Sequence, residues 1–264
     1  TVGYSANALG GAGGPLAVLI IAIVAAELGK AVSKETKIDI LATPLVTIFA
    51  GVGLSMLIAA PIGAAASQVG TLIMWATEQA PLVMGILVSV IVGVALTLPI
   101  SSAAICAALG LTGLAGGAAV AGCCAQMVGF AVMSYKENGV GGLVSQGLGT
   151  SMLQMGNIIK NPRIWIAPTL ASAITGPLAT CLFHFEMNGA AVSSGMGTCG
   201  LVGQIGVYTG WVNDIAAGTK AAITPMDWAA MLLICFVLPA VLSVVFCEIE
   251  RKLGWIKEGD LKLN

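Results

Sequence analysis

The feature that most constrains the fold is the length of chain that carries no charge. Residues 40–77, 79–135, 164–183 and 228–247 contain no charged side chain. Each stretch holds at least the ~20 apolar residues that one membrane-spanning helix requires. The whole chain is 58% hydrophobic and 9% charged, with a mean hydropathy of +0.99, whereas soluble domains have roughly 25% charged residues. The sequence therefore predicts an integral membrane protein.

The expected fold class is all-α, a polytopic transmembrane helical bundle. The apolar runs are too long for the short alternating strands of a barrel. We expect spanning helices at about 15–31, 40–60, 81–98, 114–135, 164–183 and 228–247. Residues 64–80 fit either a weak span or a helix lying in the membrane interface, and the sequence does not decide between them.

Two segments rich in serine and glycine interrupt the apolar sequence, at about 99–113 and 189–206. A membrane tolerates such backbone only where it is buried in protein or lines a cavity. Both segments are therefore expected to be re-entrant hairpins or broken helices, within a single transporter-like domain that covers residues 1–264. Solute sites of secondary transporters are commonly built in this way.

The ends and loops of the chain indicate its orientation. The chain begins at Thr1 with the glycine-rich residues 3–14 and no basic region, so we expect no signal peptide and further helices upstream. Lysine and arginine mark cytoplasmic loops, and placing residues 30–37, 160–163 and the charged tail inside the cell is consistent if residues 64–80 do not cross the membrane. The expected location is multi-pass in the cell membrane, the bacterial inner or plasma membrane.

The most polar stretch, residues 184–206, is the candidate solute site. It contains the only histidine and directly follows an uncharged run of spanning length. His184 and Glu186 project to the same side if the chain is extended there. Carboxylate, amide and hydroxyl groups together can replace the water around a hydroxylated solute. The candidate solute-binding residues are Glu186, His184, Asn188, Ser193, Ser194, Thr198, Gln204, Gln154 and Gln126.

Some of the polar residues also have a structural interpretation. Glu186 fits a charge at a helix end, Gln126 fits an interhelical hydrogen bond, and Glu27 with Lys30 fits an ion pair on one helical face. Gln154 lies in a weakly hydrophobic segment, residues 141–157. Such a segment is expected to line the solute path, since its polar side chains would otherwise meet hydrocarbon.

Other chemistry lacks support in the sequence. Gly195 to Gly200 spells GxGxxG with Asp214 downstream, but a dinucleotide site needs a strand before the motif. There is no P-loop, HExxH or GxSxG motif, so the chain contains no catalytic motif. The seven cysteines lack metal-ligand spacing, so no metal or cofactor is expected. A net charge of −1 argues against a nucleic-acid partner.

Several runs resemble a known family. They are residues 137–143, 146–154 and 177–180, the run Ile159-Lys-Asn-Pro-Arg-Ile-Trp165, and Gly195-Met-Gly-Thr-Cys-Gly-Leu-Val-Gly-Gln-Ile-Gly206. They look like type 2 EIIC membrane proteins of the sugar phosphotransferase system, in the group of the perfringolysin O regulator. The resemblance covers nearly the whole chain and implies a permease-like fold with hairpin loops and a homodimer in the lipid bilayer.

The resemblance also bears on activity. It implies a small polar solute such as a sugar, whose phosphorylation would require separate EIIA and EIIB proteins. The Gly-Ile-Thr-Glu motif of classical EIIC permeases is missing from this sequence, and only Glu186 stands in its place. Two functions stay open: a solute transporter, and a membrane sensor that binds a small molecule without transporting it. The short tail offers little surface for signalling, which favours the transporter.

Overall fold

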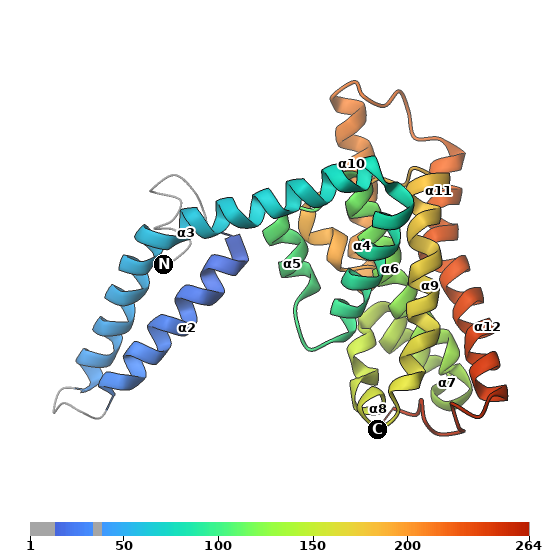
Figure 1. Ribbon diagram of the computed structural model, residues 1–264, viewed down its shortest axis with the longest axis horizontal. Helices are drawn as coiled ribbons and strands as arrows, with labels where there is room; N and C mark the ends of the chain where they lie inside the picture. Colours follow the sequence, from blue (N-terminus) through green and yellow to red (C-terminus); the bar gives the residue numbers. More distant parts are fainter. Residues whose placement is uncertain (1–13, 34–38, 264) are drawn as a thin grey trace. The chain divides into compact units, whose positions relative to one another are not determined.

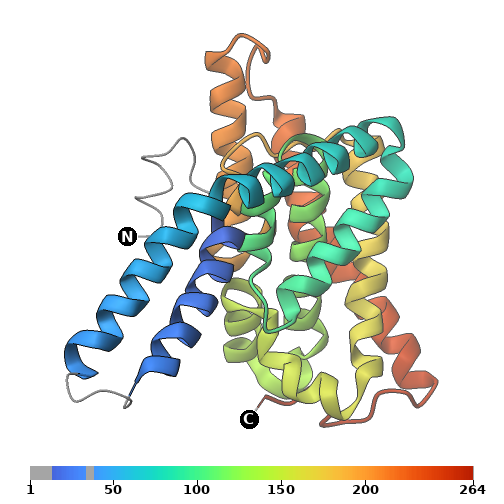
Figure 2. The same ribbon diagram turned by 60° about the vertical axis from the view of Figure 1, so that its left-hand side comes forward.

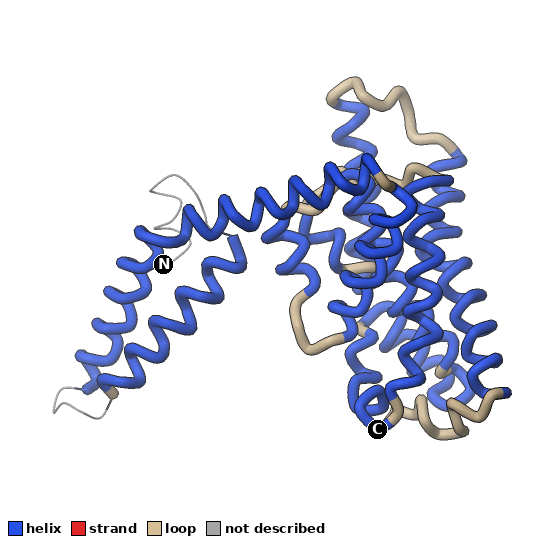
Figure 3. Tube along the Cα trace, viewed as in Figure 1, coloured by secondary structure: helices blue, strands red, loops and turns tan. Residues whose placement is uncertain are grey.

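The computed structural model describes residues 14–33 and 39–263, and in these ranges it contains helices and loops but no β-strand (Figures 1 and 3). The expected all-α membrane bundle is confirmed. Among the described residues, four helices are long and apolar enough to cross a membrane: Ile40–Gln79, Gly113–Met133, Pro162–Leu182 and Pro225–Lys252. The glycine-rich start, on which the expectations about a signal peptide and upstream helices rest, lies outside the described residues.

The chain divides into two compact units, each described by itself. Residues 1–71 with 107–109 form the first unit, and residues 72–106 with 110–264 form the second. The expectation of a single domain stays a prediction. The site described below lies entirely in the second unit.

The first unit contains α2 (Gly14–Val32) and most of α3 (Asp39–Gln79). Ala17 and Ile21 of α2 pack against Ala59 of α3 in a small apolar cluster. Lys30 and Glu27 form an exposed ion pair at 3.8 Å, which is the structural interpretation of those residues. The end expected for the helix 40–60 is wrong, because α3 continues through Pro61 as one helix of 41 residues.

Four helices form the centre of the second unit: α4 (Pro81–Thr97), α6 (Gly113–Met133), α9 (Ile166–Pro177) and α12 (Leu238–Lys252). They lie side by side, with α6 almost entirely buried among the others (Figures 1 and 2). Small residues allow this close approach. A Cβ atom at Gly122 of α6 would overlap the carbonyl group of Ser89 in α4, so the two backbones touch.

Shorter elements connect these helices. They are α5 (Ser102–Leu109), α7 (Tyr135–Val144), α8 (Met155–Lys160), α10 (Val202–Ala216) and α11 (Pro225–Leu232), π-helical turns at Ser145–Gly149, Leu178–Leu182 and Leu233–Val237, and 3-10 turns at Ser151–Gln154, Pro162–Trp165, Ala191–Gly195 and Cys199–Leu201. The region before α10 thus consists of short turns rather than a continuous helix, as expected for a broken segment.

The two serine-rich segments contact each other within the second unit. The Ser102 hydroxyl donates a hydrogen bond to the Gly195 carbonyl at 2.6 Å. The Ser194 hydroxyl donates to the Leu111 carbonyl at 2.7 Å. The serines therefore tie one interrupted segment to the other. That either segment is re-entrant in a membrane stays a prediction.

The second unit has two chemically different ends. At one end lie α7, α8 and the C-terminal tail, and at the other lies the loop between α10 and α11 (Figures 1 and 2). We call these the tail end (residues 135–163 and 248–263) and the loop end (residues 183–188 and 211–230). The tail end holds Lys136, Lys160, Arg163, Arg251, Lys252, Lys257 and Lys262, whereas Lys220 is the one cation of the loop end.

Candidate functional site

The loop end contains a cavity of about 460 Å³. Pockets that bind small molecules commonly measure ~300–1,000 Å³, so this cavity has room for one small solute. It is lined by Phe183, His184, Phe185, Glu186, Asn188, Trp211, Asp214, Thr219, Lys220, Asp227 and Ala230. Three of the residues predicted from the sequence, His184, Glu186 and Asn188, are therefore brought together.

An extended segment places these three side chains in the cavity. Met187 and Gly113 exchange two backbone hydrogen bonds of 3.0 Å, and the Phe185 N–H donates to the Ala179 carbonyl at 2.8 Å. Successive side chains of an extended chain alternate between two sides. Phe185 and Met187 are accordingly buried, while His184, Glu186 and Asn188 reach the cavity.

A glycine of α6 allows this segment to lie against the bundle. A Cβ atom at Gly117 would overlap the Phe185 carbonyl oxygen, so any larger residue would push the segment outward. His184, at the start of the segment, has a φ of 45°, a left-handed conformation that is uncommon for a residue other than glycine. The π-helical turn Leu178–Leu182, which follows α9, ends two residues before His184.

The Asn188 amide joins two carboxylates in the cavity. Its Nδ2 atom donates to Glu186 Oε2 at 3.0 Å and to Asp214 Oδ2 at 2.9 Å. Asp214 lies near the end of α10, and its backbone carbonyl accepts hydrogen bonds from the N–H groups of Thr219 and Lys220. Both carboxylates keep a second oxygen that has no hydrogen bond to any described residue, so they can accept hydrogen bonds from a solute.

The opposite wall of the cavity is held by an ion pair. Lys220 Nζ lies 2.8 Å from Asp227 Oδ1 and 5.9 Å from the centre of the Trp211 ring. Asp227 also closes a capping box with Thr224 at the start of α11. The loop between α10 and α11 is therefore fixed at the cavity by charge and by helix capping.

Four predicted residues lie outside this cavity, in the turns before α10 and in its first turn. Ser194 bonds to Leu111 as described above, and the Thr198 hydroxyl donates to the Gly147 carbonyl at 2.5 Å. Ser193 is buried against Gly206. Gln204 donates to the Cys124 sulfur at 3.3 Å, and its side-chain oxygen has no partner. Three of these side chains are occupied by protein contacts or packing, and Gln204 retains a free acceptor.

Gln126 makes interhelical hydrogen bonds, the structural alternative considered for it. Its Oε1 atom accepts from Trp165 Nε1 at 3.0 Å and from the Thr97 hydroxyl at 3.3 Å. Its Nε2 atom donates to the Thr169 hydroxyl at 3.2 Å. The fully buried side chain thus links α4, α6 and the α9 region and does not line the cavity.

Gln154 lies at the tail end, not at the cavity. Its Nε2 atom donates to Gln146 Oε1 at 2.9 Å and to the Leu261 carbonyl at 3.0 Å, and its Oε1 atom accepts from Asn157 Nδ2 at 2.8 Å. Gln146 in turn donates to the Ser134 hydroxyl at 2.8 Å. The amides of segment 141–157 therefore bind one another and the tail. From the sequence, this segment is expected to line the solute path, and its contact with the tail is not foreseen.

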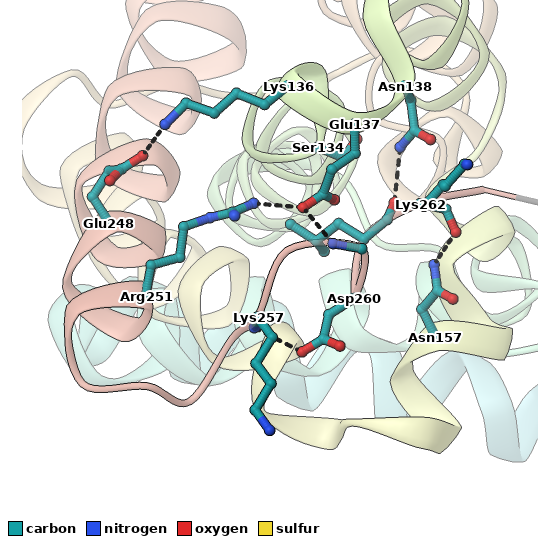
Figure 4. Close-up of polar contacts among 12 residues, drawn as sticks. Ser134, Lys136, Glu137, Asn138, Asn157, Glu248, Arg251, Lys257, Asp260 and Lys262 are labelled. Atoms are coloured by element: carbon teal, nitrogen blue, oxygen red, sulfur yellow. Dashed lines mark hydrogen bonds and ion pairs between the residues drawn. The ribbon is translucent and has the colours of Figure 1, made fainter.

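The tail is folded onto the bundle (Figure 4). Ile256 and Leu261 are buried in an apolar cluster with Phe130 and Ile164. Asn138 clamps the last residues, because its Nδ2 atom donates to the Leu261 carbonyl and its Oδ1 atom accepts from the Leu263 N–H, both at 2.8 Å. The tail is thus part of the folded core at this end.

Ion pairs reinforce the tail end. Arg251 Nη2 lies 3.0 Å from Glu137 Oε1, and both side chains are largely buried. Lys136 Nζ lies 2.7 Å from Glu248 Oε1 in a more exposed pair. Figure 4 shows both pairs beside the Asn138 and Asn157 contacts with the last residues of the tail. Most polar groups at this end have a partner within the protein, whereas Glu137 Oε2 and both carboxylate oxygens of the buried Glu250 have none among the described residues.

Eight of the eleven residues that line the cavity were missed as site candidates from the sequence, among them Trp211, Asp214, Lys220 and Asp227. A signal for three of them was available, since they are the only charged residues between position 187 and position 247. The spacing along the sequence does not show that these residues lie near Glu186. Their proximity arises because segment 184–188 and the end of α10 line the same cavity.

Comparison with known proteins agrees with the predicted resemblance to EIIC proteins of the phosphotransferase system. The family model described as Phosphotransferase system, EIIC matches residues 2–263. No curated protein and no solved structure is significantly similar to the chain. The match covers both the cavity residues and the folded tail. The chain belongs to the EIIC family of the phosphotransferase system.

Proposed function

We propose that the protein is a sugar permease whose solute binds in the cavity at the loop end. Membership of the EIIC family supports the permease function. The observation that carries the proposal about the site is the set of open hydrogen-bonding groups around Glu186, Asn188 and Asp214. Sugar hydroxyls donate to such carboxylates, and each hydrogen bond to a charged group contributes roughly 1.5–3 kcal/mol.

The orientation follows from the charge difference between the ends. Lysine and arginine collect on the cytoplasmic side of membrane proteins. The tail end is therefore cytoplasmic and the cavity faces the outside of the cell, with the protein in the cell membrane. A cavity on this side receives solute before transport rather than after it.

The interrupted segments are the proposed route inward from this cavity. Residues 99–113 and 189–206 act as re-entrant elements, and the Ser102–Gly195 and Ser194–Leu111 hydrogen bonds support their meeting inside the bundle. Gln204 adds an unpartnered side-chain oxygen in the first turn of α10. Within a membrane, polar groups without a hydrogen-bond partner are tolerated only where they are buried in protein or line a cavity.

Phosphorylation belongs to other proteins. EIIC proteins normally work with separate EIIA and EIIB components and a sugar substrate. This chain then supplies binding and passage, and the partners supply the phosphoryl group at the cytoplasmic tail end. We assign the chain to the perfringolysin O regulator group on the sequence runs that resemble it. A homodimer in the bilayer fits the exposed apolar side chains of α2 and α3, such as Leu19, Ile23 and Phe49.

Sugar uptake tests the proposed function. Purified protein is reconstituted into proteoliposomes, and uptake of radiolabelled sugars is measured with and without cytosolic phosphotransferase components inside. We expect saturable uptake that leads to accumulation of sugar phosphate when the components are present. A folded, reconstituted protein that moves no sugar under either condition would exclude the permease. Sugar binding without passage would instead favour the sensor.

A further inference from the structure

The cavity carries more negative than positive charge. Glu186, Asp214 and Asp227 contribute three carboxylates, against one lysine, Lys220, and one histidine, His184. Lys220 is already paired with Asp227 at 2.8 Å. Within the described part of the chain, no ion pair involves Glu186 or Asp214. Two carboxylates in the cavity therefore lack a cationic partner from the protein.

The geometry holds these two carboxylates close together. Glu186 Oε2 and Asp214 Oδ2 accept hydrogen bonds from the same Asn188 nitrogen, at 3.0 and 2.9 Å. Their oxygens thus lie within two hydrogen-bond lengths of each other. Like charges at this spacing repel, and the neutral amide between them removes little of that repulsion. A positive group in the cavity would interact favourably with both.

We propose that the solute carries a protonated amino group beside its hydroxyls, which makes it a member of the amino sugar class. This inference rests on the proposed function of the same cavity. An ammonium group has three donors and no acceptor, which matches the free oxygens of Glu186 and Asp214. The hydroxyls of the sugar use the remaining polar groups of the lining, such as Thr219.

The same charges disfavour other solutes. A neutral sugar of equal shape forms hydrogen bonds here without the charge attraction. A sugar phosphate is repelled, so the phosphorylated product does not compete for the cavity. Specificity then comes from an unfavourable interaction with anions as well as a favourable one with cations. A bound metal ion is a different outcome, although no group of three metal-ligating residues occurs in the described ranges.

Matched pairs of sugars test the inference. Isothermal titration of purified protein in detergent is carried out at about pH 6, where the amines are protonated. The probes are glucose, galactose and mannose, and the 2-amino derivative of each. We expect one amino sugar to bind at least ~10-fold more tightly than its parent sugar, as one charge-assisted hydrogen bond provides. Glucose 6-phosphate should not bind, and sodium or magnesium chloride at equal concentration should not displace the amino sugar.

Substitutions locate the effect. Glu186→Gln and Asp214→Asn keep the shape of the side chains and should remove the preference for the amine, because affinity for the amino sugar should fall ~10-fold more than affinity for the parent sugar. Glu258→Gln, an exposed tail residue outside the cavity lining, should change neither. Equal affinity within every pair would overturn the amine preference and leave the permease intact. If no amino sugar binds, the inference also fails. The permease function is tested separately by sugar uptake into proteoliposomes. A preference that survives both substitutions would place the amine elsewhere.

Discussion

The loop end and the tail end both contain polar side chains but use them differently. At the tail end, Gln146, Gln154 and Asn157 form a closed network in which each amide binds another side chain or the tail backbone. At the loop end, Glu186 and Asp214 share one amide and keep free oxygens in a cavity. A structural polar cluster therefore differs from a candidate binding site in one respect: its hydrogen-bonding groups already have partners within the protein.

The largest effect is expected from the glycine on which the cavity segment lies. Gly117→Val would push the Phe185 carbonyl away and displace His184, Glu186 and Asn188 together. We expect a loss of about 4 kcal/mol in stability and a loss of sugar binding, because the colliding atom belongs to the backbone. Thermal unfolding in detergent measures the first and titration the second. Gly141→Ala, where a Cβ meets no atom within 4 Å, is the control. Equal behaviour of the two variants would refute this packing.

Gln154→Leu tests whether the tail-end network is structural. The substitution leaves Gln146 Oε1 without its donor, the Leu261 carbonyl with only the Asn138 donor, and Asn157 Nδ2 with only the Lys262 carbonyl as acceptor. Each buried polar group left unpaired costs ~1–3 kcal/mol, so we expect a loss of about 3 kcal/mol in stability. Sugar affinity of the folded fraction should stay unchanged. Reduced affinity at unchanged stability would return Gln154 to the solute path. Leu153→Met, at an exposed neighbour, provides the control.

Glu186→Gln tests the opposite behaviour at the loop end. The glutamine keeps an oxygen for Asn188 but loses the charge, so stability should hardly change. Sugar affinity should fall ~10-fold, the equivalent of one charge-assisted hydrogen bond. Titration and thermal unfolding on the same preparation measure both quantities. A parent-like affinity would make Glu186 a boundary charge and move the search for the site toward Gln204.

The smallest effect is expected at the tail clamp. Asn138→Ala removes two hydrogen bonds to the last residues of the chain, those with Leu261 and Leu263. These groups lie near the surface, where water replaces part of the interaction, so we expect a loss of about 1 kcal/mol. Limited proteolysis should cleave the tail faster, with sugar affinity unchanged. An altered affinity would show that the two ends are coupled, and the tail end would then not be purely structural.

Much of the fold could be predicted from the sequence. Uncharged runs of spanning length identified the helices that became α4, α6, α9 and α12, since few other structures bury so many apolar residues. Pro61 misled the prediction for α3, because helices in membranes tolerate proline when the freed carbonyl finds another partner. The alternation at residues 184–188 was also readable, and it correctly grouped His184 with Glu186.

The composition of the site was harder to predict. Gln154 and Glu186 are both polar residues flanked by apolar sequence, and sequence alone cannot show which one has its hydrogen bonds closed. The partner of Gln154 is the Leu261 carbonyl, more than a hundred residues away along the chain. The same holds for Asp214, whose proximity to Glu186 arises only when α10 returns to the loop end. Long-range contacts thus determined the role of each residue.

Hydrogen–deuterium exchange with and without sugar compares the two ends in one experiment. We expect slower exchange on sugar binding in residues 184–188 and 211–220, which form the cavity, and unchanged exchange in residues 138–163 and 255–263 of the tail end. Protection confined to the tail end, with the cavity segments unaffected by a saturating sugar, would contradict this expectation.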